Sequence, residues 1–220
     1  MNILLMSGSP KRRNSSDESK SESASRSILS QSGQLIGARA EQEKIDCTMV
    51  NAHALDADIV QKAAACDVLV MAFPLYVDGI PSHLLSVMEK MERDGVVSAN
   101  TRIYAIVNCG FIEGEHCLPA LEMTKHWCAR CGAVWGGGLG FGGGGGLDMM
   151  ESVPLGYGPK KTLGQEINLI VDDIFGGSGT GMRYARVNFP AFMYKLGGQS
   201  GWRMMAKANG LRRRDLSKRL

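Results

Sequence analysis

The chain has 220 residues, of which 44% are hydrophobic and 21% are charged, with a formal net charge of +3. This length suits one domain with or without an appendage, and the hydrophobic fraction is sufficient for a core that needs no disulfides. A charge this close to neutral does not favour a nucleic-acid-binding protein. The sequence contains no run of about 18 apolar residues, so no membrane span is predicted.

The chain opens with an apolar run over residues 2–6, which predicts a buried strand ended by the turn residues that follow. A polar, serine-rich stretch comes next, and apolar residues at helical spacing between Ile28 and Ile36 predict a helix. A second strand is expected at 44–50, and a short helix is expected at 54–65 with Asp56 or Asp58 near its start.

Residues 67–73 predict the clearest strand, because they are continuously apolar, as a central parallel strand is. The same alternation continues to the end of this part of the chain. The expected helices are 81–91, 118–131 and 163–175, and the expected strands are 102–109 and 133–141.

Strand and helix therefore alternate five times. This order predicts an α/β fold with a doubly wound, five-stranded parallel sheet and helices on both faces. The domain is expected to cover 1–176. A C-terminal helical extension, 177–220, is expected to pack on the domain or on a partner subunit, and the basic residues near its end are interpreted as a solvated helix end.

Six scattered cysteines in a chain of this length do not predict a disulfide scaffold, so free thiols in a reducing cytoplasm are expected. No secretory signal is visible at the start. Cys128 and Cys131 form a C-x-x-C pair, but no second pair or suitably spaced histidine completes a zinc site. The pair is interpreted as packing residues, with a redox pair as the alternative.

Three loops follow the carboxyl ends of predicted strands, where open parallel sheets bind their ligands. The first contains serines, basic residues and backbone N–H groups suited to a phosphate, but it lacks the Walker A ending. The second combines two prolines, a glycine and Tyr76, and the third combines glycines, an aromatic ring and hydrogen-bonding groups. The three segments are 8–16 (GSPKRRNSS), 73–81 (FPLYVDGIP) and 108–116 (NCGFIEGEH).

Together these loops resemble the flavodoxin-like NAD(P)H-dependent FMN reductase family, over about residues 1 to 150. The resemblance implies a flavodoxin-like fold that binds FMN without a covalent bond. It implies that the FMN phosphate is held by Ser9, Lys11, Ser15 and Ser16. It places the ribityl chain and flavin along Pro74, Leu75, Tyr76, Val77 and Asp78, and the other side of the isoalloxazine against Asn108, Cys109, Gly110 and Phe111.

The resemblance implies an NAD(P)H oxidoreductase that passes electrons from a nicotinamide through FMN to a quinone or another small acceptor. The alternative is a flavodoxin-like electron carrier without its own turnover, although such carriers are typically strongly acidic. A flavin-binding regulatory module is a third alternative. A homo-oligomer in the cytoplasm is expected, without nucleic-acid or membrane partners.

No residue is assigned a catalytic role, because hydride transfer to flavin needs no protein acid or base. Tyr76 and His116 are candidate proton donors, with structural roles as the alternative. No metal is expected, and no iron–sulfur centre, because the cysteines do not form a compact cluster of four.

The glycine-rich run from Gly136 to Gly146 has two interpretations. Glycine permits a close backbone approach, so the run could lie against the flavin or a partner subunit. A mobile loop is the preferred interpretation, since the run offers no polar side chain.

Overall fold

The computed structural model describes residues 1–9, 24–52, 56–144, 152–179 and 181–217. The chain forms two compact units, Met1–Val187 and Asn188–Leu220. The first unit is an α/β domain, and it contains all three loops of the predicted site.

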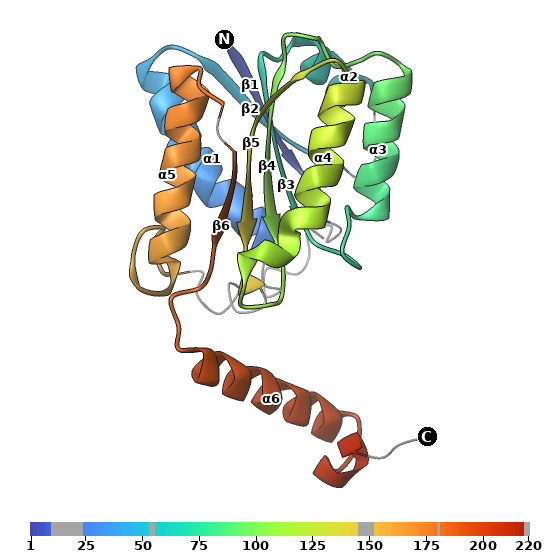
Figure 1. Ribbon diagram of the computed structural model, residues 1–220, viewed down its shortest axis with the longest axis vertical. Coiled ribbons are helices and arrows are strands. Elements are labelled where there is room, and N and C mark those ends of the chain that lie inside the picture. The colour runs from blue at the N-terminus through green and yellow to red at the C-terminus, as the bar shows by residue number, and fades with distance from the viewer. Residues whose placement is uncertain (10–23, 53–55, 145–151, 180, 218–220) are drawn as a thin grey trace. The chain divides into compact units, whose positions relative to one another are not determined.

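A parallel sheet of six strands forms the centre of this domain, in the order β2-β1-β3-β4-β5-β6 (Figure 1). The strands are β1 (Asn2–Ser7), β2 (Asp46–Asn51), β3 (Val68–Pro74), β4 (Arg102–Asn108), β5 (Val134–Phe141) and β6 (Met182–Ala185). The parallel sheet predicted from the sequence is confirmed.

The predicted number of five strands is wrong. The sixth strand, β6, lies within residues assigned from sequence to the extension, and it pairs in parallel with β5. Its four residues, MRYA, are too few and too polar at Arg183 to show the pattern of a buried strand.

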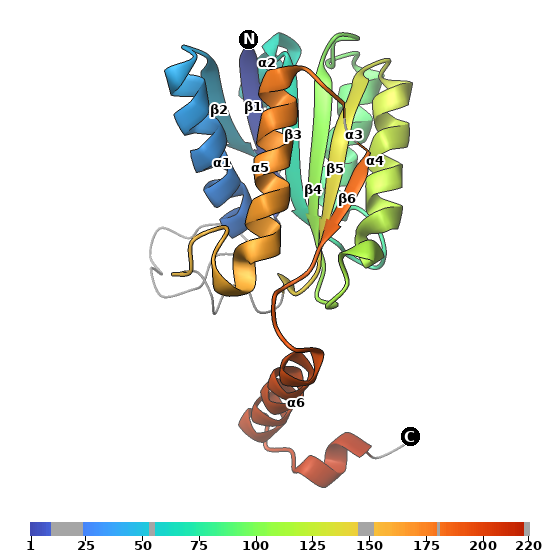
Figure 2. The ribbon, with the colours of Figure 1, turned by 60° about the vertical axis from the view of Figure 1, so that its left-hand side comes forward.

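Helices cover both faces of the sheet (Figure 2). One face carries α1 (Ala24–Gln42) and α5 (Lys161–Gly176), and the other carries α2 (Ala57–Ala65), α3 (Ser82–Arg93) and α4 (Leu118–Arg130). The predicted cap of α2 is present, because the Asp56 carboxylate accepts a hydrogen bond from the backbone N–H of Ile59 at 2.8 Å.

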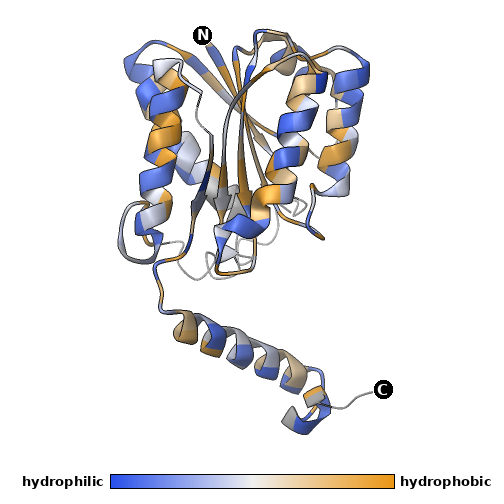
Figure 3. Cartoon of the chain, viewed as in Figure 1, coloured by the Kyte–Doolittle hydropathy of each residue, from blue (hydrophilic) through white to orange (hydrophobic). Residues whose placement is uncertain are grey.

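The core is centred on β3 and β4, whose side chains from Val68 to Phe73 and from Ile103 to Val107 are buried. Figure 3 shows apolar residues along the strands and on the helix sides that face them. Trp127 of α4 is buried in this core, and its indole N–H donates to the Met88 carbonyl at 2.9 Å. Cys128 lies in the same core, so one member of the C-x-x-C pair is a packing residue.

The glycines of β5 allow neighbouring groups to approach the strand closely. A Cβ on Gly136 would lie 2.5 Å from the ring of Tyr104, and a Cβ on Gly140 would lie 2.4 Å from the carbonyl oxygen of Gly114. The prediction of a mobile loop is therefore wrong for Gly136–Gly144, which form a buried strand and its packed end. Gly145 and Gly146 lie outside the described residues.

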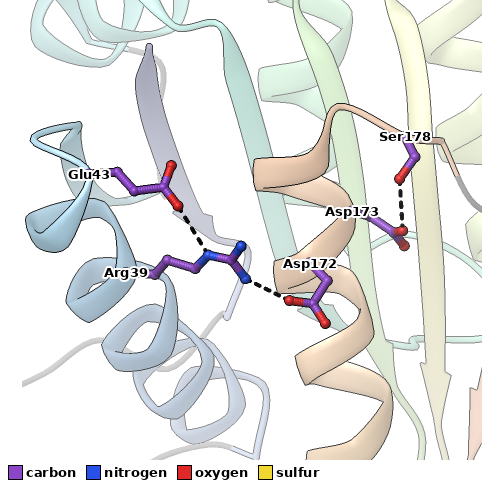
Figure 4. Close-up of polar contacts among 5 residues, drawn as sticks. All are labelled: Arg39, Glu43, Asp172, Asp173 and Ser178. Carbon is purple, nitrogen blue, oxygen red and sulfur yellow. Dashed lines mark hydrogen bonds and ion pairs between the residues drawn. The ribbon is translucent and has the colours of Figure 1, made fainter.

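The helices α1 and α5 lie side by side and are joined by polar contacts (Figure 4). The Arg39 guanidinium donates to Asp172 of α5 at 2.6 Å and to Glu43, in the turn directly after α1, at 3.2 Å. The same guanidinium lies 5.0 Å from the centre of the Phe175 ring. Asp173 accepts a hydrogen bond from Ser178 at 3.2 Å, which fixes the chain after α5.

The second unit contains α6 (Ala191–Ala208) and the short helix η5 (Arg213–Ser217). Several large apolar side chains of α6 are exposed, among them Phe192, Trp202 and Met204. No helix in the described residues is long and apolar enough to cross a membrane.

Candidate functional site

The predicted loops meet at the carboxyl edge of the sheet, where backbone hydrogen bonds join them. The N–H of Gly8 donates to Ala72 at 2.8 Å, and that of Leu75 donates to Asn108 at 2.7 Å. One strand further, the N–H of Cys109 donates to Phe141 at 2.9 Å. The ends of β1, β3, β4 and β5 therefore form one continuous surface.

The first loop leaves β1 close to the start of α3. A Cβ on Gly8 would lie 2.8 Å from the Cβ of Phe73, which cannot move aside, so this position favours glycine. The Gly8 carbonyl lies 3.1 Å from Nε2 of His83. Ser9 is buried, and its N–H contacts the hydroxyl of Ser7 at 3.4 Å. The other predicted phosphate ligands, Lys11, Ser15 and Ser16, lie outside the described residues.

The second loop is a tight turn at the end of β3. Tyr76 and Gly79 exchange two backbone hydrogen bonds of 3.0 Å, and the residues between them, Val77 and Asp78, have φ angles of +48° and +57°. Positive φ at both central positions defines a type I′ turn, which Asn and Gly favour and a β-branched residue resists. Backbone strain of this kind is often found at functional sites.

The side chains of this turn are open to a ligand. Tyr76 is half exposed and Val77 is fully exposed, whereas Pro74 and Leu75 are partly buried at the end of the strand. The turn thus presents an aromatic ring, an apolar side chain and the carboxylate of Asp78 along its rim.

The third loop begins at Asn108, the last residue of β4. Asn108 and Cys109 are buried, whereas Gly110 and Phe111 are exposed. The Phe111 ring lies 4.3 Å from the ring of His116, between centroids. This loop therefore presents a second aromatic surface at the same edge as Tyr76.

The amide oxygen of Asn108 is the polar atom that best indicates a ligand. The residue is only 6% exposed, and its Oδ1 is buried without a hydrogen-bond partner among the described residues. A buried acceptor left unpaired costs free energy, so it is expected to meet a donor in the functional state. Flavin offers such donors in its ring N–H and its ribityl hydroxyls, and the residues present here fit that group.

Two buried thiols, those of Cys109 and Cys117, lie at the two ends of this loop. The interaction with Cys117 lowers the pKa of Cys109, and the interaction with Cys109, together with burial, raises the pKa of Cys117. The Sγ of Cys109 also contacts the Glu113 carbonyl at 3.4 Å, and the Sγ of Cys117 contacts the Val107 carbonyl at 3.4 Å. These contacts fix the base of the loop below Gly110 and Phe111.

Sequence reasoning missed the contribution of residues after β5. The N–H of Gly144 donates to Cys109 at 2.8 Å, and a Cβ on Gly144 would lie 2.6 Å from Nδ2 of Asn108. A Cβ on Gly142 would lie 2.0 Å from the carbonyl oxygen of Ile112. The glycine run itself could have indicated this contribution, because repeated glycines allow another segment of the same chain to approach closely.

The described residues contain no group of three or more His, Cys, Asp or Glu side chains able to hold a metal ion. All six cysteines are free, and burial raises the pKa values of Cys128 and Cys131 to about 11. The thiols of the C-x-x-C pair are therefore protonated at neutral pH.

No family model and no curated protein matches the chain by sequence. Solved structures do match its fold. An NADH:FMN oxidoreductase shares 14% identity at a TM-score of 0.58, over 81% of this chain and 90% of that one.

Two further structures match at a TM-score of 0.52. An azoreductase from Bacillus anthracis str. Sterne is 12% identical, over 78% of this chain and 99% of that one. A flavodoxin from Streptococcus pneumonia TIGR4 is 10% identical, over 80% of this chain and 99% of that one. The first unit of this protein therefore has a flavodoxin-like fold.

Proposed function

We propose that this protein is an FMN-dependent NAD(P)H oxidoreductase that passes electrons from a nicotinamide through bound flavin to a quinone or another small acceptor. The observation that carries the proposal is the buried, unpartnered Oδ1 of Asn108 among the three loops of the carboxyl edge. The fold is one in which ligands bind at that edge. Structures with this fold include an NADH:FMN oxidoreductase and an azoreductase, which supports the reductase reading.

In this proposal the FMN supplies the redox chemistry, and the protein binds and orients it. Asn108 accepts a hydrogen bond from the flavin. The turn at Val77 and Asp78 holds its backbone against the ribityl chain, and Tyr76 and Phe111 present aromatic surfaces to the ring system. The first loop, with Ser9, Lys11, Ser15 and Ser16, holds the phosphate.

The exposed aromatic residues leave room for a second flat molecule. Tyr76 and Phe111 are each about half exposed, so a nicotinamide or quinone reaches the site from solvent. Tyr76 and His116 remain candidate proton donors to a reduced acceptor. Both are accessible, and His116 lies beside Phe111.

An electron carrier is the second candidate. The net charge of the whole chain is mildly basic, which taken alone argues against a carrier, but the charge of the flavodoxin-like unit alone favours one. Residues 188–220 hold eight of the 25 basic residues and one of the 22 acidic residues. The flavodoxin-like unit therefore has 17 basic and 21 acidic residues and is acidic by itself. The mildly basic character of the chain comes from the extension, so it does not argue against a carrier.

Anaerobic spectroscopy separates the two candidates. The FMN-loaded protein is mixed with NADPH or NADH, and then with a soluble benzoquinone. The reductase reading predicts that the flavin absorbance falls within seconds and returns when the quinone is added. A carrier would keep its absorbance with either nicotinamide and lose it only with a chemical reductant such as dithionite.

We also propose that the protein is a homo-oligomer in the cytoplasm, with the extension packing between copies. An isolated helix with three glycines, Gly197, Gly198 and Gly201, is marginal in water. A Cβ at each of these glycines would meet no atom of the described residues within 4 Å, apart from the backbone of the helix itself. Its exposed apolar side chains, such as Trp202, need a covering partner. Light scattering on the full chain is expected to give a multimer, and a Trp202→Glu variant is expected to shift it toward monomer. A monomeric wild type at micromolar concentration would refute the oligomer.

A further inference from the structure

Two buried cysteines, Cys109 and Cys117, lie at the two ends of the third loop of the candidate site. Cys109 directly follows β4, and Cys117 ends the short 3₁₀ helix η1 (Gly114–Cys117), which leads into α4. Cys109 is 3% exposed, and Cys117 is fully buried. Both side chains belong to the same core cluster, so the fold brings together two thiols that enclose one loop.

Each thiol contacts the backbone close to the other cysteine. The Sγ of Cys109 lies 3.4 Å from the carbonyl oxygen of Glu113, which directly precedes η1. The Sγ of Cys117 lies 3.4 Å from the carbonyl oxygen of Val107, two residues before Cys109. The two side chains also interact directly with each other. Since a disulfide forms only where the side chains face each other, this pair is placed to form one.

The end of β5 holds both cysteines in these positions. The backbone N–H of Cys109 donates to Phe141 at 2.9 Å, and its carbonyl accepts from the N–H of Gly144 at 2.8 Å. A Cβ on Gly140 would lie 3.0 Å from the Cβ of Cys117. The proximity of the two thiols is therefore set by the sheet and by its packing on η1.

The two thiols differ in reactivity. Their interaction lowers the pKa of Cys109 and raises that of Cys117. The thiolate is the nucleophile, so Cys109 is the more reactive of the two. The next residues, Gly110 and Phe111, are exposed, and a Cβ on Gly110 would meet no atom of the described residues within 4 Å. A small oxidant therefore reaches Cys109 first.

We propose that Cys109 and Cys117 are a reversible oxidation site, at which hydrogen peroxide converts the two thiols into a disulfide across the third loop. The Cys109 thiolate attacks one peroxide oxygen, the O–O bond breaks, hydroxide leaves, and Cys109 becomes a sulfenic acid. The sulfur of Cys117 then attacks the sulfur of that acid. The S–O bond breaks, the S–S bond forms, and the departing hydroxide takes the Cys117 proton and leaves as water.

In total, two electrons pass from the two thiols to one peroxide molecule. A thiol reductant such as dithiothreitol reverses the change by thiol–disulfide exchange. The inference goes beyond the proposed function and does not depend on flavin binding, so a failure to bind FMN would leave it standing.

The test is a peptide map of the full-length wild-type protein. The reduced protein is treated with hydrogen peroxide at neutral pH for increasing times, alkylated in denaturant and digested with trypsin. Trypsin cuts after lysine and arginine, so both cysteines fall in one peptide, 103–125, and the other four cysteines fall in different peptides. The disulfide appears in mass spectra as this peptide without alkylation and with two hydrogens lost, and dithiothreitol restores the thiols.

Cys66 is the internal control, and it falls in peptide 63–90. It is 5% exposed, so it is about as buried as Cys109, but burial raises its pKa to about 11. A more ionised thiol reacts faster, although its thiolate is a weaker nucleophile. We expect the disulfide in 103–125 to form at least about tenfold faster than Cys66 is oxidised. Oxidation of Cys66 while 103–125 keeps both thiols, or a disulfide from Cys109 to any other cysteine, would overturn the inference.

A variant tests the order of the two steps. Cys117→Ser removes the second thiol, so oxidation is expected to stop at the sulfenic acid of Cys109, which dimedone traps. Cys131→Ser is the matched control, because it removes a thiol of the C-x-x-C pair and is expected to leave the disulfide in 103–125 unchanged. A folded Cys117→Ser variant without a dimedone adduct on Cys109 would overturn the attack by Cys109. The wild-type map needs no substitution, so it decides the inference even where Cys117→Ser does not fold.

Discussion

Replacing Asn108 by leucine is expected to stabilise the apoprotein and to weaken flavin binding. Asn108 is 6% exposed, and its Oδ1 is buried without a partner among the described residues. An unsatisfied buried polar group costs about 1–3 kcal/mol, and an apolar side chain of similar shape does not carry that cost. Close packing against Gly144 offsets part of the gain, so a net stabilisation of about 1 kcal/mol is expected.

For a protein of this size, about 1 kcal/mol raises Tm by about 2–4 °C, which circular dichroism resolves. The same substitution removes the acceptor proposed for the flavin. Loss of one hydrogen bond to a buried group weakens FMN binding by about tenfold, measured as quenching of flavin fluorescence. Stability and affinity therefore change in opposite directions, which a general loss of structure does not produce.

Thr101→Val is the matched control, because it also exchanges a buried polar side chain for an apolar one of similar shape. The Thr101 hydroxyl donates to the Cys66 carbonyl at 3.1 Å, at the amino end of the sheet and away from the site. Its loss is expected to lower stability by about 1 kcal/mol and to leave FMN binding unchanged. An Asn108→Leu variant that is less stable but binds FMN normally would refute the assignment of Asn108 to the flavin.

Two further predictions concern the packing of the domain. Gly142→Ala places a Cβ 2.0 Å from the Ile112 carbonyl and is expected to destabilise the fold by about 1–3 kcal/mol or more. The control, Gly197→Ala in α6, meets no atom of the described residues within 4 Å and is not expected to destabilise the fold. Thermal unfolding followed by circular dichroism compares the two variants, and equal Tm values would contradict the tight contact at Gly142. Burial raises the pKa values of the Cys66 and Cys128 thiols to about 11, so the unfolded state loses these protons at a lower pH than the folded state does. The free energy of unfolding is therefore expected to fall as the pH rises from about 9 to 11. Urea unfolding at pH 8, 9 and 10 measures this fall, and a rise in stability would contradict the burial of the thiols.

Much of the fold could be predicted from the sequence because its elements follow local rules. The continuous apolar run that became β3 is the signature of a central parallel strand, and Asp56 is a helix cap by residue type alone. The strand β6 was missed because MRYA has no such signature, and its place beside β5 depends on tertiary pairing. The glycines of β5 were misread because their neighbours, Tyr104 and Gly114, are remote in sequence.

The candidate site was predicted in part for similar reasons. Turn residues after strands mark the carboxyl edge, so the loops containing Tyr76 and Asn108 were identifiable from their order. The positive φ angles at Val77 and Asp78 were not, because valine ordinarily avoids that conformation.

The measurement that tests the central claim most directly is a titration of the apoprotein with FMN, followed by flavin fluorescence and by the visible absorbance spectrum. The account predicts saturable binding of one FMN per chain, with weaker binding in Asn108→Leu and unchanged binding in Thr101→Val. If FMN does not bind to the folded wild-type protein, the flavin site proposed at the carboxyl edge of the sheet is wrong.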